Sequence, residues 1–422
     1  MFQFRFLRLG LIVALAAAGL HAAPALLGIA SHAYAQEQAV TLRPEVGKPL
    51  QAAQELLKAK KYKEALAKVN EADSASGKTP NETVTIERMR ATVAYAAGDR
   101  ETATKSFESV LASGRVTGPD KLKIMQALGG MHYQAKDYPK AITWYSRYLK
   151  EGGEDAAIRP LLIQSYYLNN DFARAASEVQ ADIHAAEKAG RAPGEEQLQL
   201  LANCALKQND KAGYVNAIEK LVAYHPKKDY WIDLLNRVQA KPGFADRLTL
   251  DVYRLKFAAG LVNKADQYME MTQLALQAGF PAEAVKFVEH GFKTGVLGTG
   301  ADAARQKRLR DLANKSAADD SKTITQAETD AAKNKDGTGL VNLGYAYVSA
   351  GQFDKGISLM EQGIGKGGIK RAEDAKLHLA IAYLRAGQKA KAIQTFKSVQ
   401  GTDGTADLAR YWVMHANRPI SQ

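Results

Sequence analysis

The stretch GGMHYQAKDYPKA at residues 129–141 decides the fold of this 422-residue chain. It starts with small residues, passes Tyr133, turns at Lys136-Asp137 and ends on a small anchor residue, Ala141. The large apolar Tyr145 follows four positions later, and residues four apart share one face of a helix. The pattern therefore predicts two short helices joined by a tight turn, with the anchor and Tyr145 buried between them.

Copies of this pattern recur along the chain at a nearly constant interval. Successive anchors lie 34–39 residues apart, or about twice that distance in two places, which is typical of helix-turn-helix solenoids. The two double intervals predict degenerate units around residues 247–249 and around Asp320, giving about ten units in all. The anchors are Ala65, Ala103, Ala141, Ala175, Tyr214, Ala284, Gly356 and Ala392.

Three further positions of the unit follow from physical requirements. Twelve residues before the anchor the side chain is small, so that two antiparallel helices can approach closely; these residues are Ala53, Ala91, Gly129, Ala202, Gly344 and Ala380. Five before the anchor stands a residue that accepts the left-handed conformation ending a helix, namely Gly98, Asn170, Asn209, Gly279, Gly351 and Gly387. Four after it, large apolar residues share the anchor's face, including Phe107, Ile218, Val288, Met360 and Phe396.

The array resembles the tetratricopeptide repeat family over most of residues 50–400. This resemblance implies an all-α fold, in which paired antiparallel helices stack into a right-handed α-solenoid with a concave groove. The family's frequent first-helix tryptophan is nearly absent, with Trp231 the one candidate. A capping helix should follow the last repeat, because a terminal repeat needs its outer face covered.

The pattern also predicts the domain organisation. Residues 293–338 are polar and rich in Gly, Ala, Asp, Lys and Thr, so we expect a degenerate repeat with two helices, at about 301–315 and 318–333, that acts as a hinge. The predicted segments are a signal at 1–35, a linker at 36–49, an N-terminal repeat block at 50–292, the hinge at 293–338, C-terminal repeats at 339–400, and a capping helix with its tail at 401–422.

The first 35 residues have the features of a secretory signal. Arg5 and Arg8 precede an apolar run at 9–20, and Ala-Tyr-Ala at 33–35 is a small-residue cleavage site before Gln36. An uncleaved membrane anchor is the alternative, because apolar residues continue beyond position 20. The segment contains no cysteine, which excludes a lipoprotein. The sequence therefore predicts a periplasmic protein without stable membrane insertion after cleavage.

Charge and composition argue against catalysis and against nucleic acid. The net charge is +12, and +10 without Arg5 and Arg8, but acids and bases alternate as on a solvated helical surface. Cys204 is the only cysteine and lies in an apolar segment, so an internal disulfide and a thiolate zinc site are excluded. The histidines show no metal-binding spacing. We therefore predict no enzyme, no cofactor and no metal, with an enzyme assembled across repeats as a remote alternative.

A tyrosine stripe is the best candidate site. Tyr95, Tyr133 and Tyr167 stand eight residues before their anchors, a position that in the resembled family lies on the first helix and faces the concave groove. An arginine and two glutamines precede them at helical spacing. The candidate partner-binding face is Tyr95, Tyr133, Tyr167, Arg88, Gln126 and Gln164. Such side chains suit an extended peptide, although packing alone also explains tyrosine at this position.

These observations favour a scaffold for protein–protein interactions in a periplasmic cell-envelope assembly. The runs KDYWIDLL at 228–235, GFPAEAVKF at 279–287 and ARYW at 409–412 are similar to those of periplasmic repeat proteins that accompany TonB/ExbB/ExbD-type systems. The expected partner is a protein or peptide. The basic surplus leaves a second hypothesis, a binding module for an anionic envelope polymer such as a polysaccharide or a peptidoglycan-related chain.

Overall fold

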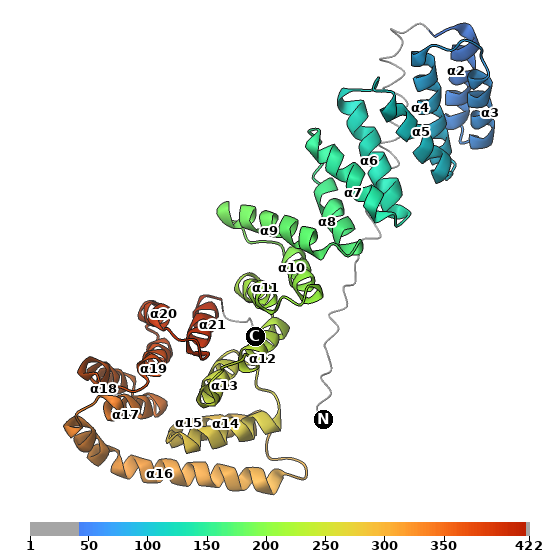
Figure 1. The fold of residues 1–422 in the computed structure, drawn as a ribbon. Coiled ribbons are helices and arrows are strands. Elements are labelled where there is room, and N and C mark those ends of the chain that lie inside the picture. The colour runs from blue at the N-terminus through green and yellow to red at the C-terminus, as the bar shows by residue number, and fades with distance from the viewer. Residues whose placement is uncertain (1–41, 419–422) are drawn as a thin grey trace. The chain divides into compact units, whose positions relative to one another are not determined.

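The computed structural model describes residues 42–418, and within that range the fold is all-α, with no strand (Figure 1). The predicted signal at 1–35 lies outside the described residues. Contacts divide the chain into two compact units, Met1–Ala181 and Asp182–Gln422, here called unit 1 and unit 2. No helix in the described range combines the length and apolar character needed to cross a membrane.

Unit 1 is a run of helical hairpins in chain order (Figure 1). Helix α2 begins at Pro44, inside the segment 36–49 that the sequence analysis treated as a linker, and Pro at the start of a helix is favourable. The helices are α2 (Pro44–Lys58), α3 (Tyr62–Asp73), α4 (Pro80–Ala96), α5 (Arg100–Ala112), α6 (Gly118–Gln134), α7 (Tyr138–Lys150), α8 (Ile158–Leu168) and α9 (Phe172–Lys188), within which the unit boundary falls.

Unit 2 continues with the same hairpins but contains two irregular parts, a 3-10 turn and a long helix. Its elements are α10 (Glu195–Lys207), α11 (Lys211–Tyr224), α12 (Lys228–Gln239), η2 (Asp246–Leu248), α13 (Thr249–Ala258), α14 (Ala265–Gln277), α15 (Pro281–Lys293), α16 (Ala303–Lys333), α17 (Thr338–Ser349), α18 (Phe353–Lys366), α19 (Ala372–Arg385), α20 (Lys389–Ser398) and α21 (Thr405–Asn417).

The predicted repeat positions form the core. Every predicted anchor residue is buried, and so are the large apolar residues four positions later. At the small position of two hairpins only glycine fits. A Cβ on Gly129 would lie 2.5 Å from the ring of Tyr145, and a Cβ on Gly344 would lie 2.5 Å from the carbonyl oxygen of Gly356. The all-α solenoid predicted from the sequence is confirmed.

Turns between paired helices also follow the prediction. All six Gly and Asn residues expected in the left-handed conformation have φ between 56° and 85°. The equivalent residues of two other repeats, Lys60 and Lys136, adopt it as well, with φ of 58° and 61°. The next residue is Asp99 or Asp137 in two of these turns, and its carboxylate accepts a hydrogen bond from the first turn of the following helix. This cap satisfies an otherwise unpaired backbone N–H group.

One expected unit is different. The two helices predicted at about 301–315 and 318–333 are a single 31-residue helix, α16, so the expectation of a turn near Asp320 is wrong. The physical reason is composition, because residues 303–333 contain neither Gly nor Pro and are rich in Ala, with Lys and Arg among the other helix formers. A polar sequence with strong helix formers continues as one helix when nothing breaks it.

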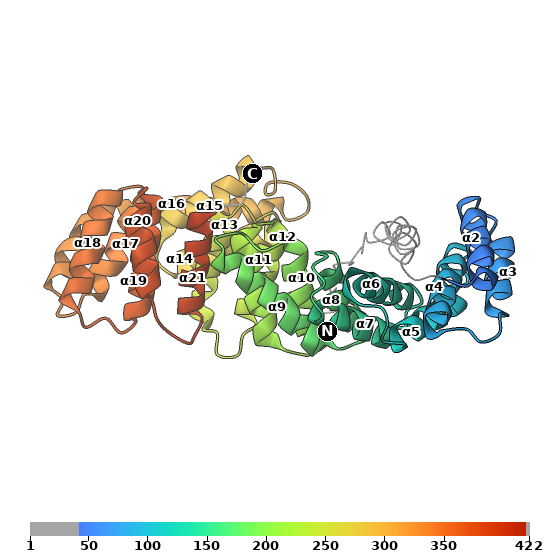
Figure 2. The same cartoon turned by 90° about the horizontal axis from the view of Figure 1, so that it is seen from above.

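The last helix does more than cap the final repeat. Helix α21 packs on α19 and α20, as the sequence predicted, and its residues also contact α11, α12 and α13 (Figures 1 and 2). The Trp412 ring stacks on Phe396 of α20 at 6.0 Å, and His415 meets Trp231 of α12 at 6.2 Å. Unit 2 therefore closes on itself, which an array with contacts between neighbouring repeats alone would not do.

Candidate functional site

The predicted face of unit 1 presents three half-buried tyrosines, one on each of helices α4, α6 and α8. Tyr133 meets Tyr138 edge to face at 5.9 Å, and Tyr167 meets Phe172 in the same way at 5.3 Å. In both cases the partner ring starts the second helix of the same hairpin. Burial raises the pKa of Tyr133, with a smaller contribution from Tyr138. The rings of Tyr133 and Tyr167 are thus held by a neighbouring ring, and all three tyrosines are only partly exposed.

The polar residues of this face connect successive first helices. Arg88 on α4 pairs with Asp120 on α6, with 2.9 Å between Nη2 and Oδ2. Gln126 on α6 donates a hydrogen bond of 2.8 Å to Asp155, just before α8. Gln164 is half-buried on α8. The structure therefore gives Arg88 and Gln126 a role in holding neighbouring repeats in register, and partner binding by the six residues stays a prediction.

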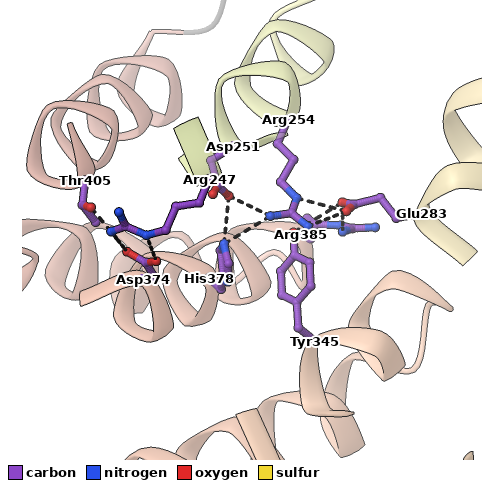
Figure 3. A network of polar contacts seen from close by, with 9 residues as sticks. All are labelled: Arg247, Asp251, Arg254, Glu283, Tyr345, Asp374, His378, Arg385 and Thr405. Carbon is purple, nitrogen blue, oxygen red and sulfur yellow. Dashed lines mark hydrogen bonds and ion pairs between the residues drawn. The ribbon is translucent and has the colours of Figure 1, made fainter. Parts of the chain in front are cut away.

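A second cluster, not predicted from the sequence, lies inside unit 2. Its members are spread over more than 130 residues and come from α13, α15, α17 and α19 (Figure 3). They are the charged or titratable residues Asp251, Arg254, Glu283, His378 and Arg385, together with Tyr345. We call these six residues the buried network.

Arg254 is the centre of the buried network. Its guanidinium donates to Glu283 Oε2 through Nε at 3.0 Å and Nη2 at 2.7 Å, and to Asp251 Oδ1 through Nη1 at 2.7 Å. The guanidinium also lies over the Tyr345 ring, 4.6 Å from its centroid. The side chains of Arg254, Asp251 and Glu283 are only 4%, 4% and 3% exposed. Charges this deep are stable only with such pairing.

The return helices α17 and α19 complete this pairing. His378 Nε2 lies 2.9 Å from Asp251 Oδ1 and 3.1 Å from Arg254 Nη1. Tyr345 donates from its hydroxyl to Glu283 at 3.4 Å. Burial alone would raise the pKa of Asp251, but the charges of His378 and Arg254 hold it well below its usual range. The pKa of the Tyr345 hydroxyl is raised, mainly by burial.

More exposed ion pairs surround the buried network. Arg410 of α21 binds Glu219 of α11 with both nitrogens, at 3.1 and 2.7 Å. Arg247 binds Asp374 of α19 in the same bidentate way, at 2.7 and 2.9 Å, and Asp403 at 2.6 Å. All these pairs join residues 127 to 191 positions apart. Repeat periodicity carries no signal for such pairs.

The three runs that suggested an envelope family all contribute to the contacts that close unit 2. Trp231, from the run at 228–235, and Trp412, from the run at 409–412, both contact the ring of His415. From the run at 279–287, Phe280 packs against Tyr345 at 5.0 Å while Glu283 pairs with Arg254. The residues that looked distinctive in the sequence are therefore those that close unit 2.

The only cysteine of the chain can be located in the structure. Cys204 is fully buried in α10, as predicted, and burial raises the pKa of its thiol to about 11. Among residues 42–418 no group of three or more His, Cys, Asp or Glu side chains is placed to hold a metal ion. The buried network is made of mutually paired charges, and such an arrangement is suited to holding four helices together.

These features define an α-solenoid of helical hairpins, and comparison gives the repeat class. Residues 88–156 and 341–407 match the tetratricopeptide repeat family model, so the chain carries tetratricopeptide repeats in both units. The repeat class predicted from the sequence is confirmed. A comparison with curated proteins finds no sequence match.

Several solved structures are similar at low identity. The TPR2AB domain of yeast Sti1, in a complex with pHSP90, is 13% identical, covers 71% of this chain and 100% of that chain, and has a TM-score of 0.24. Yeast Tom70 is 14% identical, with coverage of 88% and 95% and a TM-score of 0.24. The maize pentatricopeptide repeat protein PPR10 is 12% identical, with coverage of 94% and 67% and a TM-score of 0.30. A likeness this distant carries no argument about partners.

Proposed function

We propose that this chain is a periplasmic scaffold that holds an extended segment of a protein partner on the predicted face of unit 1. The observation that carries the proposal is the row of half-buried tyrosines on successive first helices, Tyr95, Tyr133 and Tyr167. Tetratricopeptide repeats generally act as protein-interaction scaffolds, and their stacked hairpins create extended binding surfaces.

Physical features of this face support the proposal. Tyrosine combines a large apolar ring with a polar hydroxyl and loses little conformational entropy on binding. The rings of Tyr133 and Tyr167 are already held by Tyr138 and Phe172, so part of the ordering cost is met before a partner arrives. Arg88 fixes the spacing of the first two helices through Asp120. The face is therefore preorganised for a segment that crosses three repeats.

The partner-binding proposal can be tested by site-specific photo-crosslinking in cells. A photoreactive phenylalanine analogue at position 95, 133 or 167 should form adducts with the same protein partner. The matched control is position 105, where Lys105 on α5 is 74% exposed and pairs with Glu101 of its own helix. Adducts at Lys105 equal to those at the tyrosines would contradict a specific face, and so would none at any tyrosine.

The location can be tested separately. A cleaved secretory signal predicts a mature protein that starts at Gln36 and is released with the periplasmic fraction. N-terminal sequencing of the purified native protein measures this. A chain that keeps Met1 and stays with the membranes would instead support the anchor alternative. The TonB/ExbB/ExbD-like setting suggested by the three sequence runs is part of this proposal, and loss of the crosslinked partner from cells lacking such a system would support it.

One observation favours the second candidate function, binding of an anionic polymer. Arg305, Lys307 and Arg308 on α16 are exposed and make no ion pair with the part of the chain the structure describes. Replacing all three with alanine should weaken binding to a purified anionic polysaccharide and flatten its salt dependence. If salt abolishes polysaccharide binding equally in the wild type and the variant, the interaction is nonspecific charge attraction and the second candidate function is contradicted.

A further inference from the structure

The closure of unit 2 contains a short segment that is bound in the manner of a ligand. Residues 401–407, Gly-Thr-Asp-Gly-Thr-Ala-Asp, form an acidic turn that includes the first three residues of α21. It lies against residues 241–247, a segment after α12 that includes the first two residues of η2, which we call the docking loop. The two segments are about 160 positions apart in the sequence, and their chemistry is complementary.

The docking loop offers a backbone donor, two cations and an aromatic ring. The Ala245 N–H donates to the Asp403 carbonyl oxygen at 2.9 Å, and Arg247 Nη2 donates to the Asp403 carboxylate at 2.6 Å. Lys241 Nζ donates to Asp407 at 2.8 Å. Gly404 packs on the ring of Phe244 so closely that a Cβ there would lie 2.5 Å from the ring. Both carboxylates, the backbone and the glycine are thus recognised at once.

Arg247 of the docking loop and both aspartates of the acidic turn have a further partner outside the contact between the two segments. Arg247 also holds Asp374 through two hydrogen bonds, and Asp407 also pairs with Arg410 three residues on. Asp403 accepts from the Thr405 hydroxyl at 2.7 Å within the turn. Leaving a charge without a partner is the main cost of breaking an ion pair, and here that cost is reduced on both sides.

The side chains that pair the docking loop with the acidic turn are partly exposed to solvent. The side chains of Lys241, Arg247 and Asp403 are 46%, 29% and 36% exposed, whereas those of Arg254 and Asp251 in the buried network are both 4% exposed. Asp407, the partner of Lys241, is 15% exposed. Although burial alone would raise the pKa of Asp403, hydrogen bonds from Arg247 and Thr405 hold it at about 2, so the carboxylate stays charged. Water and a competing acidic segment can therefore reach these pairs.

We propose that the docking loop is a binding site for an acidic peptide segment of a partner protein, and that the chain's own acidic turn occupies this site in the structure. The turn is then an autoinhibitory contact. A partner that presents two carboxylates around a glycine displaces it, and α21 loses one of its attachments. This site lies outside the tyrosine face, so the proposal does not depend on the proposed function.

The test uses the full chain with Asp403→Asn and Asp407→Asn. Asparagine at position 403 keeps an oxygen that can accept the hydrogen bond from the Thr405 hydroxyl but removes the charge. The probe is a fluorescent, end-capped peptide of residues 400–408, followed by anisotropy. While the chain's own turn occupies the site, the peptide can bind only those molecules whose site is open. Its apparent affinity is therefore the intrinsic affinity multiplied by the open fraction. We expect the double variant to bind the peptide about tenfold more tightly than the wild type. Hydrogen exchange at 401–417 should rise at the same time.

Two controls make the result specific. Adding Arg247→Ala to the double variant should abolish peptide binding, and a probe with both aspartates replaced by asparagine should not bind. Asp319→Asn, which breaks an exposed pair with Lys322 on α16, should leave both measurements at the wild-type value. If exchange at 401–417 is unchanged in the double variant, the ion pairs do not hold the turn and the proposal fails. If exchange rises but no peptide binds, the contact is only part of the fold and the proposal also fails.

Discussion

Units 1 and 2 are built from the same hairpin but differ in how far along the chain their polar contacts reach. In unit 1 the most distant described pair is Arg43 with Glu82, 39 residues apart, which is about one repeat. In unit 2, Arg254 contacts His378 at a separation of 124 residues, and Arg418 reaches the Tyr224 carbonyl oxygen across 194. The same repeat therefore supports both a neighbour-to-neighbour array and a closed unit.

This difference shows what closure requires. Neighbouring hairpins pack through small and apolar residues at repeat-specific positions, so the stability of an open array is roughly a sum of local terms. Closure instead joins segments that share no repeat position, and its described contacts are mostly charged pairs. Removing one partner of a buried pair leaves the other charge without compensation, which is strongly destabilising. We therefore expect unit 2 to be more sensitive than unit 1 to loss of single charges.

The largest effect is expected for Arg254→Ala. It leaves Asp251 and Glu283 buried and short of partners, which should cost about 3–5 kcal/mol of unfolding free energy. Urea unfolding followed by the reactivity of the buried Cys204 thiol measures unit 2 specifically, because this is the only cysteine. The control in unit 1 is Arg88→Ala, monitored by circular dichroism, with an expected loss of about 1–2 kcal/mol. Equal losses would remove the contrast between the units.

A smaller effect is expected for Gly344→Ala in unit 2. The new Cβ would meet the carbonyl oxygen of Gly356 at 2.5 Å, and backbone moves only if the two helices separate, so we expect a loss of about 1–3 kcal/mol. Gly129→Ala is the matching change in unit 1. There the Cβ meets the Tyr145 ring, a side chain that can shift. Thermal unfolding should show a greater loss for position 344; the reverse order would contradict this packing.

Arg410→Ala should have a still smaller effect. Its side chain is 44% exposed and pairs with Glu219 at the edge of the closure, where water screens the attraction. A partly exposed pair contributes about 0.5–1 kcal/mol. A double-mutant cycle with Glu219→Ala isolates this coupling in urea unfolding. A coupling energy as large as the effect of Arg254→Ala would mean that the edge of the closure, and not its centre, holds unit 2 together.

The last prediction concerns unit 1 and the loss of its stability in acid. The pKa of Glu82 is lowered to about 2 from 4.5, first by the hydrogen bond from Arg43 and then by that from Thr79. Because the folded pKa is the lower one, the ionised carboxylate stabilises the fold fully above about pH 4.5, and this contribution is lost as the pH falls toward 2.

Melting temperatures of the wild type and Glu82→Gln between pH 5 and 2.5 test this assignment. The two proteins should differ most at pH 5 and converge toward the acid end. Glu101→Gln is the control. Glu101 lies on α5, the helix after the one that carries Glu82, and forms an exposed pair with Lys105 of the same helix. A difference between wild type and Glu82→Gln that stays constant with pH would show that the Arg43 pair contributes nothing through charge.

Much of the fold was predictable from the sequence because the same pattern of residue types recurs in successive repeats. Eight anchors, the small residues twelve positions earlier and the left-handed turn residues all lie where the period places them. Lys60 and Lys136 show the limit of the turn rule, because position in the repeat imposes a left-handed conformation that residue type alone does not suggest. The uninterrupted helix α16 was missed because the period was extended through a segment without breakers.

Closure was not predictable, for a physical reason. Arg254, Glu283 and His378 stand at unrelated positions of their repeats. No periodic pattern therefore marks them as partners. In a linear sequence Arg254 resembles any surface arginine, although in the structure it is 5% exposed and contacts residues of α15, α17 and α19. Of the candidate site, the sequence located the tyrosines on their helices, but it did not show that Arg88 and Gln126 are engaged with Asp120 and Asp155.

Hydrogen exchange measured by mass spectrometry on Arg254→Ala and Arg88→Ala tests the central claim most directly. If unit 2 is closed through its buried network, Arg254→Ala should speed exchange in α13 and also in α19, more than 110 residues away, while α2–α8 keep their wild-type protection. Arg88→Ala should affect only α4 and its neighbours. Faster exchange in α13 with unchanged protection of α19 would contradict the account, because the two parts of unit 2 would then be independent.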